Sequence, residues 1–278
     1  MELFDTHFHF DGEESYENFL ARCREDLQLA GKNFRRLPDK LRMLCAGSDF
    51  EESKIAMGFA DNSPEVYFAC GVHPHAAEEY CKLTAKVDFS IFKDHPKLLA
   101  IGEIGLDYFY DMSDRESQLT TLQEFLDLAL KWDLPAMLHL RDKENIFDAY
   151  DDALTMLENF TGKGGRFVIH CYAGNREYAE KFLALGGFFG VTGMYTFKAA
   201  HNIREAISVI PTGRLLIETD SPYLAPVPFR GRSNTPGMVA LVAQALGADR
   251  RMTPEEAAQT FADNAKNFYR INKKGELV

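Results

Sequence analysis

Two histidines near the start of the chain are the first residues whose type and spacing suggest chemistry. His7 and His9 follow residues 2–5, an apolar stub too short to be anything but a strand. Side chains alternate between the two faces of a strand, so both imidazoles point the same way. Together they can hold one metal ion. Asp5, on the same face, could orient one of the metal ligands without binding the ion itself. A histidine flanked by aromatic residues can equally be a hydrogen-bonded core residue, so the pair alone leaves both interpretations open.

Further potential ligands stand at the ends of apolar runs. Six of the eight histidines do so, together with Glu103 and Asp220, and only His95 and His201 lie elsewhere. The set consists of His7, His9, His73, His75, Glu103, His139, His170 and Asp220. Glu103 lies in an apolar run between glycines, where an unpaired carboxylate would cost on the order of several kcal/mol. A metal ion or a buried ion pair must therefore compensate its charge.

Four imidazoles and two carboxylates suffice to hold two divalent ions. We assign the first ion to His7, His9 and Asp220 and the second to His139 and His170, with Glu103 as the bridging carboxylate. Mixed nitrogen and oxygen ligands suit zinc, the first choice, with magnesium, manganese, cobalt, nickel and iron as alternatives. Two ions about 3.5–4 Å apart can share a water, lower its pKa and polarise the bond to be cleaved. The set predicts a hydrolase whose catalytic residues are Asp220, as general base, and Glu103.

Residues that could bind substrate are less distinctive. His73 and His75 flank Pro74 on a loop, where they could hold substrate oxygens or only stabilise the loop. Cations and aromatic residues share the loops after the strands, and the substrate-binding candidates among them are Arg141, Tyr223 and Arg230. A cation next to an aromatic ring can bind a phosphate and a stacked base, although such residues also pack beneath long loops. Arg141 could equally form a surface contact with Asp142.

The elements that must position these residues follow a regular alternation. Apolar runs bounded by Gly, Asp or Pro alternate with helical patterns, and the expected strands are residues 2–5, 41–46, 66–72, 98–103, 136–139, 167–170, 187–191 and 215–218. Eight such units in 278 residues favour an α/β fold of the (β/α)8 TIM-barrel type over an open doubly wound sheet. We expect one domain over residues 1–278. A barrel would bring the strand ends, and hence the ligands, to one rim.

Two helical segments illustrate the pattern. The last helix is expected to begin with Thr253 as N-cap, Pro254 in the first turn and Glu256 completing a capping box. The segment 12–40 is longer and more charged than a crossover helix needs. Its cations most simply form a solvated face, and a partner-binding role is the alternative.

Charge and cysteine content limit the function classes. A net charge of −11 repels polyanions at long range, so an extended nucleic-acid-binding surface is not expected. A local basic patch at an active-site mouth is compatible with this charge. The five cysteines contain no C-x-x-C pair, which fits free thiols in a reducing cytosol. Cys171 is expected in the core, because alternation turns it away from His170. No basic and apolar leader and no run of about eighteen apolar residues occurs, so we expect a cytoplasmic monomer that does not contact a membrane.

The sequence resembles the TatD family of metal-dependent deoxyribonucleases, part of the amidohydrolase-like group of barrels. The resemblance extends from residue 1 to about 270 and is carried by residues 4–9, 71–75, 101–108, 138–142, 170–174 and 218–226. It implies a (β/α)8 barrel with one to three divalent ions on the ligands assigned above. It also implies that His73 and His75 lie near a bound phosphate. The sequence departs from the family at Thr235, where the family usually has Glu, and in the long segment 12–40.

These features support three functions to different degrees. The first is a metal-dependent phosphodiesterase that trims DNA at its ends, as the family resemblance implies. The second is hydrolysis of a small ester, lactone or amide, since the same activated water can attack a carbonyl carbon. The third is a non-catalytic binding barrel, which predicts lost ligands, whereas all six assigned ligands are present.

Overall fold

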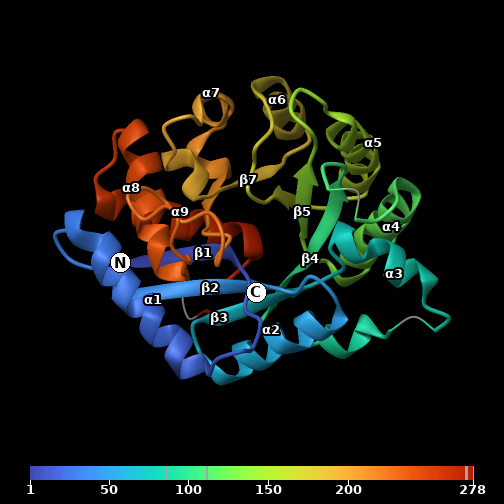
Figure 1. The fold of residues 1–278 in the computed structure, drawn as a ribbon, viewed down its shortest axis with the longest axis horizontal. Coiled ribbons are helices and arrows are strands. Elements are labelled where there is room, and N and C mark those ends of the chain that lie inside the picture. Colours follow the sequence, from blue (N-terminus) through green and yellow to red (C-terminus); the bar gives the residue numbers. More distant parts are fainter. Residues whose placement is uncertain (86, 111, 273–274, 278) are drawn as a thin grey trace.

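The computed structural model describes residues 1–85, 87–110, 112–272 and 275–277. In this part of the chain, eight strands form one parallel sheet in which every strand pairs with its neighbour in sequence, from β1 to β8. The sheet closes where Phe8 bridges to Ser221, just beyond β8. Helices surround the strands in a ring, as Figure 1 shows. The TIM-barrel fold predicted from the alternation of strands and helices is confirmed.

The strands begin within a residue of their expected positions but several end elsewhere. Their bounds are β1 Glu2–Phe8, β2 Lys40–Ala46, β3 Val66–Cys70, β4 Leu98–Asp107, β5 Ala136–Arg141, β6 Phe167–Ile169, β7 Phe188–Val191 and β8 Leu215–Ile217. Strands β1, β4 and β5 therefore continue through residues expected in loops, while β3 ends two residues early. As a result, His7, Glu103 and His139 lie inside strands and are held by the sheet itself.

The helices occupy the intervals between the strands. They are α1 Tyr16–Ala30, α2 Phe50–Asn62, α3 Ala77–Lys82, α4 Arg115–Trp132, α5 Asp148–Gly162, α6 Arg176–Ala184, α7 His201–Ser208, α8 Val239–Asp249 and α9 Pro254–Tyr269. Short 3-10 helices lie at Gly31–Asn33, Pro74–Ala76, Phe89–Phe92, Gly193–Thr196, Thr212–Arg214 and Pro236–Met238. The capping box of α9 forms as predicted, with Thr253 accepting from the Glu256 amide. No helix in the described ranges is long and apolar enough to cross a membrane.

The segment 12–40 consists of α1, a 3-10 turn and a short connection to β2. Its cations are exposed, as the sequence predicts, while Phe19, Cys23 and Leu27 of α1 are buried. Thr235 donates to Asp26 of α1 at 2.8 Å. The residue that departs from the family pattern therefore ties this longer segment to the loop after β8.

Two apolar clusters hold the barrel together. The larger one lies between the strands and the surrounding helices. The smaller one combines strand residues such as Phe4, Leu44 and Met137 with Phe268 and Tyr269 from the end of α9. Phe4 contacts Tyr269 with ring centroids 6.3 Å apart, so the last turn of α9 packs against the residues of β1. Packing in this second cluster supports the ligand-bearing strands from within.

A polar network joins the beginnings of β1 and β2 to α9. The Arg42 guanidinium, almost fully buried, donates to Glu2 at 3.0 Å and to the Tyr67 hydroxyl at 2.6 Å. Lys266 of α9 also binds Glu2. Burial alone would raise the pKa of Glu2, but Lys266 and Arg42 lower it below its usual value. Because Arg42 is buried, removing its carboxylate partner would leave an incompletely paired charge.

We expect Glu2→Ala to lower the free energy of unfolding by about 3 kcal/mol, the low end for breaking a buried pair. Urea unfolding followed by circular dichroism measures the change. Asp39→Asn is the matched control, because Asp39 pairs with Arg36 on the exposed surface, where a pair contributes less than about 1 kcal/mol. Equal losses in the two variants would contradict the role given to the buried pair.

Candidate metal centre

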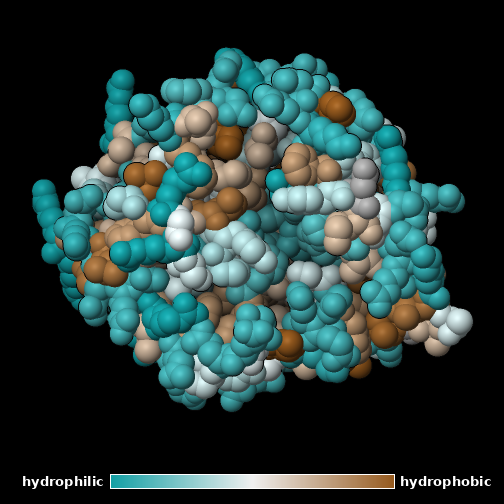
Figure 2. All heavy atoms as spheres, viewed as in Figure 1, coloured by the Kyte–Doolittle hydropathy of each residue, from teal (hydrophilic) through white to brown (hydrophobic). Residues whose placement is uncertain are grey.

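The predicted ligands meet in a cleft at the carboxyl ends of the strands. The cleft has a volume of about 1060 Å³ and is lined by residues from the loops after most strands. His9, Glu103, His139, His170 and Asp220 all line it. The face seen in Figure 2 is hollowed near its middle. The carboxyl ends of the strands are where barrel enzymes carry their chemistry.

Three donor atoms, from the end of β1 and from the loops after β1 and β8, lie around one oxygen of Glu103. The Nε2 atoms of His7 and His9 are 3.1 Å apart, and they lie 3.3 and 3.5 Å from Glu103 Oε2. Asp220 Oδ1 is 3.7 Å from the first of these nitrogens and 3.6 Å from the second. Ligands bound tetrahedrally to one zinc ion at 2.0–2.2 Å are about 3.3–3.6 Å apart. The spacing of these atoms therefore fits a shared ion.

A second group of imidazoles faces the other oxygen of Glu103. His170 Nε2 lies 2.7 Å from Oε1, and His139 Nδ1 lies 2.9 Å from it. His73 Nε2 is 3.6 Å from the same oxygen, so it points into the centre. The two carboxylate oxygens thus face different sets of nitrogen atoms. Both sets are compatible with bound ions, and Glu103 lies between them, which is the arrangement that a bridging carboxylate requires.

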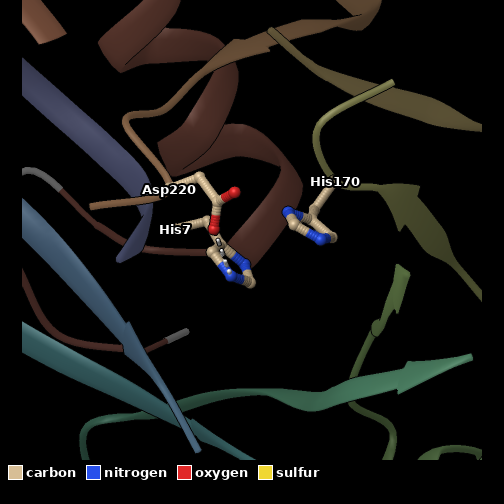
Figure 3. Close-up of side chains that lie close together, drawn as sticks. All are labelled: His7, His170 and Asp220. Carbon is tan, nitrogen blue, oxygen red and sulfur yellow. Dashed lines mark ion pairs between the residues drawn. The ribbon is translucent and has the colours of Figure 1, made fainter. Parts of the chain in front are cut away.

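Figure 3 shows how β1, β6 and β8 contribute to this centre. The Asp220 carboxylate lies beside the His7 ring, and His170 comes from the loop after β6. The rings of His7 and His170 stack with centroids 4.0 Å apart. His7, His170 and Asp220 form one of three groups in the described chain whose donor atoms could hold an ion. The other two groups contain Glu103, with His7 and His9 in one and His73 and His139 in the other.

Close packing of β4 against β5 brings Glu103 to this position. A Cβ atom on Gly102 would lie 2.6 Å from the Met137 side chain, and one on Gly105 would lie 1.9 Å from the His139 carbonyl oxygen. Gly105 also has φ +150°, a conformation that L side chains rarely adopt. Only glycine therefore fits at these two positions, one residue before and two residues after Glu103, where β4 meets the strand that carries His139.

The charges of the centre are strongly coupled. Burial alone would raise the pKa of Glu103, but His170, His7 and His73 hold it well below its usual value. Burial opposes protonation of His170, yet the carboxylate of Glu103 raises the pKa of His170 well above its ordinary value. The negative charge of the carboxylates and the positive charge of the imidazoles thus compensate each other in the absence of an ion. A divalent cation would supply the same compensation, and carboxylate and imidazole are the ligands it needs.

Asp5 acts on the backbone near the centre and not on an imidazole. Its carboxylate accepts from the Thr219 amide at 2.8 Å and from the Thr219 hydroxyl at 2.5 Å. The Asp220 amide donates to the His7 carbonyl at 2.9 Å. Asp220 itself has φ +54°, which an aspartate tolerates better than most residues. Asp5 therefore fixes the turn that presents Asp220, so it orients an assigned ligand through the backbone of its neighbour.

Asp107 contributes to the centre and was not among the predicted site residues. It is fully buried at the end of β4, and its Oδ2 lies 2.9 Å from His75 Nε2 and 3.0 Å from His139 Nε2. Its Oδ1 accepts from the amides of Phe109 and Tyr110. A carboxylate behind a metal-binding imidazole fixes the ring and its tautomer. The sequence does hold one signal for this role. Asp107 lies four residues after Glu103 on the same strand, and an even spacing on a strand predicts side chains on the same face.

The substrate-binding candidates occupy different positions. His75 binds Asp107, and Arg141 and Tyr223 line the cleft, with the Tyr223 ring 6.4 Å from that of His9. Arg230 is not among the described residues of the lining, because its guanidinium lies over Phe197, 4.2 Å from the ring centroid. Asp142 accepts from the Ala149 amide at 2.7 Å, and the Arg141 guanidinium lies over the rings of Phe109 and Tyr110.

Cys171 lies in the cleft, so its expected place in the core is wrong. Strand β6 ends at Ile169, and Cys171 has φ +47°. Strict alternation therefore stops before this residue. Its thiol lies 3.4 Å from the Thr192 hydroxyl, and burial raises its pKa well above the usual value. A thiol in this state is not a strong nucleophile.

The fold and this centre are those of a metal-dependent hydrolase of the amidohydrolase-like barrels. Residues 4–270 match the family described as TatD related DNase, and the chain belongs to this family. It is 34% identical over 274 residues to YabD of Bacillus subtilis, described as an uncharacterized metal-dependent hydrolase, covering 97% of this chain and 100% of that protein.

Two further relatives support the same assignment. The TatD protein of Erwinia billingiae, described as a 3'-5' ssDNA/RNA exonuclease, is 33% identical and the match covers 82% of this chain and 87% of that one. The crystal structure of YjjV, a TatD homologue from Escherichia coli, superposes with a TM-score of 0.79 at 28% identity, covering 97% of this chain and 98% of that one.

We expect Asp107→Asn to weaken metal binding about 10- to 100-fold. The amide oxygen can keep the bonds to the Phe109 and Tyr110 amides, which leaves an NH2 group facing His139 Nε2. That nitrogen must then accept, so the proton moves to Nδ1, the atom that faces Glu103. Isothermal titration with Zn²⁺ measures the loss. Asp152→Asn, which removes a carboxylate bound to Tyr108 outside the centre, is the control, and an unchanged affinity in Asp107→Asn would contradict the prediction.

Proposed function

We propose that the protein is a metal-dependent phosphodiesterase that removes nucleotides from the ends of DNA strands. One observation carries the proposal: the buried Glu103 carboxylate lies between two sets of imidazoles at the floor of an open cleft, with Asp220 beside it. Such an arrangement suits hydrolysis of an ester by activated water. The nucleic-acid part rests on relatives described as ssDNA/RNA exonucleases and on the cation and aromatic residues at the cleft.

The residues around Glu103 would hold the ions in two groups. His7, His9 and Asp220 lie on one side of the carboxylate, and His139, His170 and His73 lie on the other. Divalent ions bound there would supply a water of lowered pKa and would polarise the phosphoryl oxygens. Zinc remains the first choice for this mixed nitrogen and oxygen set.

Asp220 is placed to take the proton of the attacking water. Burial raises its pKa, but His9, which binds it directly, and His170 and His7 bring the pKa below the usual value. The side chain is therefore a carboxylate at neutral pH and can accept a proton. The Thr219 turn, held by Asp5, and the bond from its own amide to the His7 carbonyl fix the carboxylate next to the first group of nitrogens.

A carbonyl substrate is the competing class. An activated water and a carboxylate base also hydrolyse esters, lactones and amides. Exposed aromatic side chains at the mouth, such as Tyr110 and Tyr223, favour substrates with flat rings, which nucleotides supply. The two classes differ in the bond that is cleaved, so one panel of substrates separates them.

We expect the zinc-loaded protein to cleave single-stranded DNA and bis(p-nitrophenyl) phosphate, and Asp220→Asn to lower kcat about 10²- to 10⁴-fold on both. A chelator should abolish both activities, and added Zn²⁺ should restore them. The metal content of the variant, measured by atomic emission, separates loss of the base from loss of a ligand. Asp61→Asn is the control, because Asp61 pairs with His95 outside the cleft.

A different result would point to the carbonyl class. If DNA and the diester stay intact while a lactone opens in an Asp220-dependent way, the phosphodiesterase proposal is wrong. Glu103→Gln should bind less metal than Asp61→Asn in either case, because it removes the charge between the two groups of imidazoles.

A further inference from the structure

The charges that line the cleft are unequally distributed. The segments that follow β1, β2 and β3 contribute five carboxylates outside the metal centre, namely Asp11, Glu14, Asp49, Glu52 and Glu79. Two of them are fixed by local bonds, because Asp49 accepts from the Glu52 amide and Glu52 accepts from the Ser48 amide. A strand of nucleic acid laid across this side would bring its phosphates next to fixed negative charge.

Only two cations line the cleft in the described part of the chain, Arg22 and Arg141. Arg22 forms an ion pair with Glu14, so its charge is already compensated. Arg141 follows His139 by two residues at the end of β5, and its guanidinium lies 4.5 and 4.6 Å from the ring centroids of Phe109 and Tyr110. No carboxylate of the described residues pairs with it. Arg141 is thus the one uncompensated cation of the lining.

Three further arginines lie on segments that border the cleft, and they have different partners. Arg176 pairs with Glu180, and the guanidiniums of Arg230 and Arg232 lie over Phe197 and Phe229. None of the three belongs to the described lining of the cleft. Within the described lining of the cleft, a strand would therefore meet one cation without a carboxylate partner, Arg141.

The aromatic residues next to Arg141 suit the base of a nucleotide. Phe109 and Tyr110 are 39% and 50% exposed, and Tyr223 on the loop after β8 is 62% exposed. The two rings hold the guanidinium in place through cation–π contacts. An arginine fixed in this way can bind a phosphate through two parallel bonds.

We propose that the protein recognises only the terminal nucleotides of a strand, with the scissile phosphate at the metal centre and one flanking phosphate on Arg141. This inference rests on the proposed phosphodiesterase function. It defines the substrate class as dinucleotides and strand ends that carry one phosphate next to the scissile one. Strand length beyond these nucleotides adds no contact, so it should not increase the efficiency per strand end.

Salt dependence and substrate length test the inference together. Each phosphate contact on a single strand contributes about −0.7 to the slope of log kcat/KM against log[salt]. We expect a slope near −0.7 for a thymidine dinucleotide with a terminal phosphate and for a long oligothymidylate, at similar kcat/KM per strand end. The dinucleotide that lacks the terminal phosphate should be cleaved about 10- to 100-fold less efficiently.

Arg141→Gln should abolish the preference for the phosphorylated dinucleotide and flatten the salt dependence. Arg36→Gln is the matched control, since it removes the same charge from an exposed ion pair just before β2, outside the cleft, and should keep both properties. Any of three results would overturn the inference. They are a salt-dependence slope several times steeper than about −0.7, a kcat/KM per strand end that rises with strand length, and an Arg141→Gln variant that still prefers the phosphorylated dinucleotide. Cleavage as such is the separate test of chemistry. If the wild-type protein cleaves neither single-stranded DNA nor bis(p-nitrophenyl) phosphate, the proposed function is wrong, and this inference is lost with it.

Discussion

The structure depends on keeping one carboxylate ionised in the middle of a barrel. Glu103 is 2% exposed, and burying its charge alone would be prohibitively unfavourable. Imidazoles from β1 and β5 and from the loops after β3 and β6 surround both of its oxygens. Every strand that supplies a partner must end at the right height for these contacts to form. The parallel barrel provides this, because it brings the carboxyl ends of all its strands to one rim.

A second layer of carboxylates holds the first in place. Asp107 binds the far nitrogens of His75 and His139, Asp5 holds the turn before Asp220, and Glu218 accepts from the Cys171 amide and the Thr6 hydroxyl. Each of these bonds joins strands or loops that are distant in sequence. The position of the reacting groups is therefore a property of the closed barrel, and the buried pair of Arg42 and Glu2 contributes to it from the opposite end.

The sequence predicted the barrel and the residues that meet in it, because apolar runs and the polar residues at their ends are local signals. It did not predict which atoms would face one another. His73 was predicted to hold substrate oxygens or to stabilise its loop, and the structure adds that its Nε2 lies 3.6 Å from Glu103 Oε1. Cys171 was expected in the core, yet a left-handed backbone turns it into the cleft. The role of Asp107 depends on the extension of β4 by four residues, and the roles of Thr235 and Asp5 depend on contacts with residues more than two hundred positions away. Such contacts leave no periodic signal in the chain.

The central claim is that Glu103 lies between two metal ions. Anomalous diffraction from crystals grown with Zn²⁺, recorded on both sides of the zinc absorption edge, locates bound ions directly. The account predicts two peaks, one bounded by His7, His9 and Asp220 and one by His139 and His170, with a different oxygen of Glu103 bound to each. Zinc bound elsewhere on the chain, or a centre without any peak within bonding distance of Glu103, would contradict it.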